Sequence, residues 1–131
     1  MRIHAGRAGF TLIELLIVIV VIGVLAAIAI PKFAVTKERS YLATMKSDLH
    51  NLISVQEGYL SDNAAYYAGG IPDPSLVYRP SSGTTVTMVA ATTSGWQATA
   101  TYTGTAKTCA LFYGNIGAIA PANVNGEPKC T

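Results

Sequence analysis

A long apolar segment close to the N-terminus restricts what this chain can fold into more than any other feature of its sequence. Residues 10–30 read FTLIELLIVIVVIGVLAAIAI, and positions 15–30 contain no charged or hydrogen-bonding side chain. As an α-helix this run would be about 31 Å long, which is enough to cross the hydrocarbon core of a bilayer. Because Arg2 and Arg7 precede the run and no acidic residue does, its N-terminal end is predicted to stay in the cytoplasm.

Three interpretations of this segment compete. A secretory signal peptide could be cut after Ala29, because Ala27-Ile28-Ala29 fits the small-x-small cleavage pattern. Against this, the run is long, contains a carboxylate, and would leave Pro31 as the second residue of the product. A plain membrane anchor has no use for Glu14. In the third interpretation Glu14 is functional, since an ionisable group inside an apolar helix costs up to about 3 kcal/mol near the bilayer centre and usually has a partner.

Cleavage between Gly9 and Phe10 would create such a partner. No basic side chain lies within the run, but a new α-amino group on Phe10 would lie four residues, or about 6 Å, from Glu14 along the helix. A second copy displaced axially by about that distance would bring its amine beside this carboxylate. The contact is heterologous, and when it repeats without closing it builds a helical filament.

The residues GFTLIE at positions 9–14, after a short basic leader and before the apolar run, closely resemble a known processing signal. This is the type III signal of the type IV pilin superfamily, which includes type IV pilins and the pseudopilins of type II secretion. The resemblance covers about the first 60 residues. It implies that a membrane prepilin peptidase removes Met1–Gly9 and N-methylates Phe10, and that Glu14 neutralises the amine of a neighbouring subunit.

Gly23 and Pro31, which the resemblance also covers, mark a stretch of low helix propensity within or next to the apolar run. Two interpretations stay open for this helix-loosening pair. One is local loosening, since the stretch is often extended or melted in the related filaments. The other is a gentle kink alone, which a membrane helix tolerates.

After Pro31 the sequence predicts an amphipathic helix that ends near residues 61–63. Residues 37–68 also resemble the post-proline helix of bacterial type IV pilins, which favours a pilin over a pseudopilin. The charged residues are expected mostly off the apolar face; they are Lys37, Arg39, Lys46, Asp48 and Glu57. The apolar face follows a spacing of three and four; it comprises Tyr41, Leu42, Met45, Leu49, Leu52, Ile53, Gln56, Tyr59 and Leu60.

The remaining chain is expected to form a small head of loops and antiparallel sheet. Val86, Met88 and Ala90 alternate with more exposed positions and are expected to face the helix. The fold class is therefore α+β, a long N-terminal helix on an antiparallel sheet of about three to four strands, which is the pilin fold that the resemblance implies. The strand candidates, separated by turn-forming residues, are 84–91, 96–103 and 108–113.

Cys109 and Cys130 are the two cysteines of the chain, and they allow one pairing. The export signal indicates an oxidising compartment, which favours a disulfide over two unrelated thiols. Closing a loop of about 20 residues would contribute roughly 3 kcal/mol. In the family a disulfide-closed C-terminal segment is often exposed and variable, and residues 114–130 would occupy that place here.

The sequence gives no indication of catalysis, a metal site or a cofactor. His4 and His50 are the two histidines, and no catalytic triad, paired histidine ligands or phosphate loop is present. The formal charge of +2 comes from Arg2 and Arg7, since seven basic and seven acidic side chains remain without them. No clustered basic face predicts binding to nucleic acid.

The domain organisation expected from the sequence is a removed leader, a membrane or filament-core helix, an amphipathic helix and a head, with boundaries at 1–9, 10–31, 32–62 and 63–131. The chain is expected to be a pilin that moves from the inner membrane into an extracellular filament for adhesion, surface motility or DNA uptake. Copies of itself, the peptidase, an assembly platform and an ATPase motor are the partners that the resemblance implies. The alternatives are a type II secretion pseudopilin, acting as a periplasmic piston, and a minor pilin.

Overall fold

The computed structural model describes residues 9–131, which form one long helix followed by four strands. The chain divides into two compact units, Met1–Thr36 and Lys37–Thr131. The predicted leader lies outside the described residues except for Gly9. The elements are α1 (Leu12–Asn63), β1 (Thr84–Ala91), β2 (Gly95–Tyr102), β3 (Thr108–Gly114) and β4 (Lys129–Cys130).

In the first unit the described chain is helical from Leu12 onward. The helix continues through Gly23 and Pro31, so the backbone of a single copy is not melted at either residue. Local loosening of residues 23–31 in an assembly stays a prediction, and so does the alternative of a gentle kink alone.

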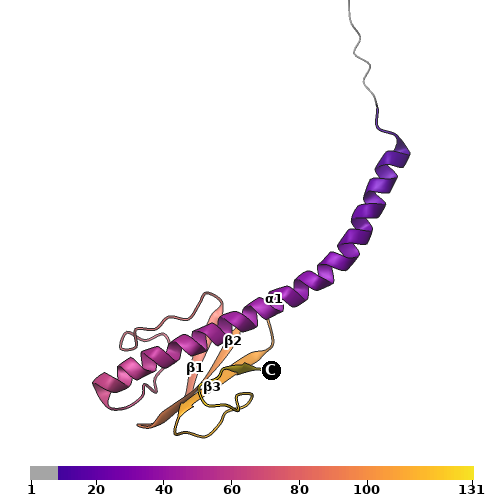
Figure 1. Cartoon of the computed structure of the whole chain (residues 1–131). Helices are drawn as coiled ribbons and strands as arrows, with labels where there is room; N and C mark the ends of the chain where they lie inside the picture. The colour runs from indigo at the N-terminus through magenta and orange to yellow at the C-terminus, as the bar shows by residue number, and fades with distance from the viewer. Residues whose placement is uncertain (1–8) are drawn as a thin grey trace, which may run out of the picture. The chain divides into compact units, whose positions relative to one another are not determined.

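The second unit is built on an antiparallel meander in the order β1-β2-β3-β4 (Figure 1). The α+β class and the number of strands predicted from the sequence are confirmed. β1 begins and ends where the sequence predicts, and β2 and β3 are each within a residue of the predicted bounds. The short β4 places Cys130 directly opposite Cys109 on β3, and the predicted disulfide joins them.

The core of the second unit lies between one face of the sheet and the C-terminal part of α1. Met45, Leu49 and Leu52, which the 3–4 spacing identified, are fully buried against the sheet residues Trp96 and Leu111. Burying large apolar side chains from both layers supplies the main stabilisation of a unit of this size.

Gln56 is a polar residue on the same buried helix face, and its amide fastens the connection between helix and sheet. Its Nε2 donates to the carbonyl oxygen of Tyr67 at 3.0 Å, and its Oε1 accepts from the Tyr67 amide at 2.9 Å. Both polar ends of a fully buried side chain are thereby satisfied. The segment after the helix is held back against α1 by this pair.

The alternation predicted along β1 is correct at Val86 and Met88 but wrong at Ala90, which is exposed. The pairing with β2 shifts between Met88 and Ala90, so Val89 is an extra residue in a β-bulge. A bulge moves the following side chains to the other face of the strand. Ala91 therefore takes the inward position and packs against the core.

Asp48 is a second correction, because the sequence placed it among the charged residues off the apolar face. It is 4% exposed, and its carboxylate accepts from the Ser81 amide at 3.0 Å and from Ser81 Oγ at 2.8 Å. In addition, Tyr78 Oη donates to the Asp48 carbonyl oxygen at 2.8 Å. The buried charge thus anchors residues 78–81 to the helix.

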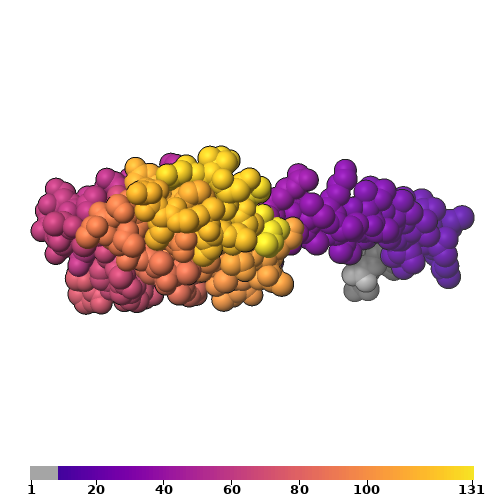
Figure 2. Space-filling view, turned by 90° about the horizontal axis from the view of Figure 1, so that it is seen from below, coloured from indigo at the N-terminus to yellow at the C-terminus, as the bar shows by residue number. Residues whose placement is uncertain are grey.

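The C-terminal segment from Gly114 to Cys130 covers part of the second unit's surface, where it is drawn in gold and yellow in Figure 2. Ala122 packs on Ala110 and Phe112 of β3 in a small cluster separate from the main core. The Asn125 side chain donates to the Gly114 carbonyl at 3.0 Å and accepts from the Gly114 amide at 3.1 Å. The segment is therefore held at Asn125 as well as at the disulfide.

Candidate assembly site

The N-terminal end of α1 is closed by a capping box formed by Thr11 and Glu14. The Thr11 amide and Oγ1 both donate to Glu14 Oε2 at 2.7 Å, and the Glu14 amide donates to Thr11 Oγ1 at 3.3 Å. Each side chain satisfies a backbone amide that the helix leaves without a partner. A carboxylate here also interacts favourably with the positive end of the helix dipole.

Thr11 is a residue of this candidate site that the sequence analysis did not single out. The signal was present, since Thr followed three residues later by Glu before an apolar run is the pattern of a capping box. A neutral hydroxyl within the same turn is thus a partner of Glu14 in addition to the charged partner expected from the sequence.

The capping contacts use one oxygen of Glu14 and leave the other open. Within residues 9–131, Oε1 of Glu14 has no hydrogen-bond partner, whereas Oε2 accepts twice from Thr11. A carboxylate has about four acceptor positions, so Glu14 can cap its own helix and accept from a cation at the same time. Phe10 is 79% exposed four residues before it, which leaves room for another chain to approach.

The side chains that follow Glu14 form a continuous apolar surface. The residues from Leu15 to Ile30 are exposed in the single chain except for one partly exposed position. In the part of the chain that the structure describes, α1 is long and apolar enough to cross a membrane. Apolar patches this large on a protein mark contact with lipid or with another protein.

The other site residues predicted from the sequence lie in three separate places. Gly9 is the first described residue, and a Cβ built on it would meet nothing within 4 Å among the described atoms. Gly23 and Pro31 lie further along the same helix. Cys109 and Cys130 belong to the second unit, where they bind each other.

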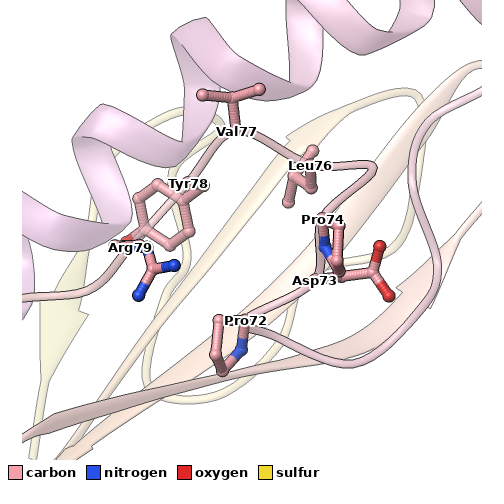
Figure 3. Close-up of a pocket in the computed structure, with 7 residues that line it drawn as sticks. All are labelled: Pro72, Asp73, Pro74, Leu76, Val77, Tyr78 and Arg79. Atoms are coloured by element: carbon pink, nitrogen blue, oxygen red, sulfur yellow. The ribbon is translucent and has the colours of Figure 1, made fainter.

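The surface of the second unit is hollowed along the loop that follows the helix. Figure 3 shows a hollow of about 570 Å³ that is lined by residues of the loop from Pro72 to Arg79. Asp73 there accepts from the Ser75 side chain and amide, and these bonds lower the pKa of its carboxyl. Among residues 9–131 no group of three or more histidine, cysteine or acidic residues could hold a metal ion.

Comparison with known proteins gives a family motif at this end of the chain. Residues 4–30 match the prokaryotic N-terminal methylation motif. The match includes Gly9, Phe10, Thr11 and Glu14, so the capping box lies inside the motif.

The relatives are pilins and secretion-system proteins. The chain is 43% identical over 65 residues to type IV major pilin protein PilA of Myxococcus xanthus, covering 50% of this chain and 30% of that protein. It is 43% identical over 58 residues to type IV wide pilus major component PilA4 of Thermus thermophilus, covering 44% of each. Identity to type II secretion system core protein G of Pseudomonas aeruginosa is 31% over 74 residues, 56% of this chain and 52% of that protein.

The chain thus spans about half, or less, of the length of these curated relatives. The methylation motif accounts for the N-terminal end, and the relatives extend the similarity past the apolar run. The long helix on a four-stranded antiparallel sheet, with its C-terminal disulfide, is the α+β pilin fold. Motif, relatives and fold together support the type IV pilin superfamily as the family of this chain.

Proposed function

We propose that this chain is a pilin, a structural subunit that polymerises through its N-terminal helix into a type IV pilus-like filament. The observation that carries the proposal is the state of Glu14 in a single copy. Its Oε2 caps the helix and its Oε1 is open, beside an exposed apolar surface. A cationic amine of a second copy fits the open oxygen, and helix-to-helix burial supplies the cohesion.

Processing is part of the same proposal. A prepilin peptidase cuts between Gly9 and Phe10 and N-methylates Phe10, and the methylated amine stays charged at neutral pH. The match of residues 4–30 to a methylation motif supports this. Residues 1–9 are then the leader, 10–31 the filament core, 32–62 the helix that carries the head, and 63–131 the head.

Before assembly the subunit lies in the inner membrane. It is then incorporated into an extracellular pilus that serves adhesion, surface motility or DNA uptake. An assembly platform and an ATPase motor are the machinery that such a filament requires. The similarity to two major pilus components supports this placement.

A second candidate is a pseudopilin of type II secretion, which would build a short periplasmic piston. The 31% identity to type II core protein G, over 56% of this chain, supports this candidate. Deleting the gene distinguishes the two. Loss of surface fibres with normal enzyme export indicates the pilin, and blocked export with intact fibres indicates the pseudopilin.

The first test is the intact mass and N-terminus of the chain from cells, together with the composition of sheared filaments. The proposal expects a start at N-methylated Phe10 and the chain as a component of the filaments. A start at Ile30 would indicate a secreted domain, and an intact Met1 in cells with an active peptidase would indicate a plain anchor. Either result refutes the proposal.

Glu14→Gln tests the role of the carboxylate separately from capping. Glutamine also closes a capping box, so the variant keeps the helix end and removes only the charge. We expect normal cleavage but at least a tenfold loss of filaments, while Thr11→Val, which removes the cap and keeps the charge, retains more filament. Full assembly of Glu14→Gln would contradict the proposed pairing.

A further inference from the structure

A groove of about 330 Å³ lies beside the C-terminal end of α1, from Ser54 to Asn63, within the second unit. Its lining is mixed: Val55 and Tyr59 of the helix and Leu76 and Val77 of the following loop supply the apolar part, and Ser54, Asp62, Asn63 and Ser75 the polar part. Val77 is 92% exposed, and Figure 3 shows it beside the helix ribbon. An almost fully exposed valine at the edge of a groove with apolar and charged lining is typical of a surface that is covered in an assembly.

Gly58 lines this groove and lies inside α1, five residues before the end of the helix. A Cβ added to it would meet nothing within 4 Å among the described atoms beyond its own stretch of helix. Glycine in a helix interior is less stable than alanine, and nothing within the described chain requires the missing side chain. The space beside Gly58 is therefore open to a group from outside the described residues.

The charge around the groove is acidic and uncompensated. Asp62 lines the groove in the last helical turn, where no basic residue is present. A carboxylate is unfavourable at the negative end of the helix dipole, where a cation would be favoured. The ion pair that the described residues form, Glu38 with Lys107, does not involve Asp62.

Two exposed basic residues of α1 lie on the opposite side of the helix from Asp62. At about 100° per residue, Lys46 is about 160° and Arg39 about 140° around the axis from Asp62. Both side chains are exposed, and neither forms an ion pair among residues 9–131. In a heterologous contact a surface of one copy meets a different surface of the next, so the positive charges of Arg39 and Lys46 on one copy are complementary to Asp62 on another.

We propose that the groove beside Gly58 is an assembly surface whose occupant is the helix of a second copy, with Arg39 and Lys46 of that copy next to Asp62. The proposal rests on the proposed filament function and deepens it. The axial offset is about 24 to 35 Å, much larger than the offset of about 6 Å at Glu14. The groove therefore contacts a different neighbour from the one that engages Glu14.

The test is a substitution that stabilises the single subunit and at the same time lowers the yield of filaments. Gly58→Ala is expected to raise the Tm of the full chain in detergent by about 4 to 8 °C and yet lower the yield of sheared filaments. Gly58→Leu is expected to lower that yield about tenfold or more, because overpacking a closed interface is strongly unfavourable. Immunoblots of membranes confirm that each variant accumulates at the wild-type level.

Gly117→Leu is the matched control, because Gly117 is also exposed with open space around it and lies outside the groove. It is expected to leave filament yield unchanged. Wild-type yield from Gly58→Leu would overturn the inference and leave the proposed function intact. Absence of filaments from wild-type cells would instead refute the proposed function.

Charge reversal identifies the occupant. Asp62→Lys is expected to reduce filament yield, and a second change in the same chain, Lys46→Asp or Arg39→Asp, is expected to restore it at least partly. Restoration requires that the two positions meet between copies, since one helix separates them within a copy. If neither reversal restores assembly, the occupant is not this face of a second copy and the inference is wrong.

Discussion

Removing the buried carboxylate of Asp48 should detach the loop after the helix and destabilise the second unit. The carboxylate accepts two hydrogen bonds from Ser81, at 3.0 and 2.8 Å. Hydrogen bonds to a charged group contribute about 1.5–3 kcal/mol each. Because Ser81 is exposed and can bind water instead, we expect Asp48→Ala to lower the free energy of unfolding by about 2–4 kcal/mol.

The expected change in Tm follows from the size of the unit. Lys37–Thr131 contains about 95 residues, for which 1 kcal/mol corresponds to about 4–8 °C. Asp48→Ala should therefore lower Tm by roughly 10–25 °C. Asp48→Asn keeps one acceptor oxygen and should lose about half as much stability.

The assay is thermal unfolding of the full chain in detergent, followed by tryptophan fluorescence. Trp96 is the one tryptophan of the chain and is fully buried in the second unit, so the signal does not report on the membrane helix. Asn51→Ala is the control, because Asn51 is an exposed polar residue on the same helix and should change stability by less than about 0.5 kcal/mol. Equal, small effects of the two alanine variants would refute the argument.

Two further predictions concern the same unit. Reducing the disulfide, or replacing Cys109 and Cys130 by alanine, should lower its stability by about 3 kcal/mol; the Tm difference with and without reductant measures this, and an unchanged Tm would contradict it. Burial and the hydrogen bond to Glu57 raise the pKa of Tyr66 to about 12, from a usual value of 10.0. The stability from the neutral phenol is then complete below pH 10 and lost as the pH rises through 12. Tyr66→Phe should flatten this alkaline part of the pH profile of Tm, and an identical profile would exclude the residue.

Local patterns in the sequence were sufficient for most of the fold. The 3–4 spacing of apolar residues after Pro31 identified Met45, Leu49 and Leu52 as core, because a helix facing a single sheet buries one stripe. Threonine-rich segments between glycine turns identified the strands within a residue or so. The resemblance of residues 9–14 to a processing signal was sufficient to predict a candidate site at the N-terminal end of the helix.

The errors occurred where a tertiary contact decides the outcome. A bulge at Val89 depends on how β1 pairs with β2, which periodicity within β1 does not contain. Asp48 is buried because Ser81, 33 residues later, supplies its hydrogen bonds. The groove at Gly58 depends on the path of the loop that carries Leu76 and Val77. Thr11 is different, because its contact with Glu14 follows from a local pattern, Thr followed three residues later by Glu.

The C-terminal segment is attached to the second unit at two points, so its exposed residues can change with little effect on the stability of the fold. Asn125 fastens the segment to Gly114 and the disulfide fastens Cys130 to Cys109, so the residues between have fixed ends. Doubling the length of a flexible loop costs only about 0.6 kcal/mol, and most side chains in residues 115–125 are exposed. Residues 115–125 can therefore tolerate changes in length and in side-chain chemistry while the helix and the sheet stay unchanged. In a protein built in this way, the exposed surface of residues 115–125 can differ between related proteins while the helix and the sheet keep the same fold.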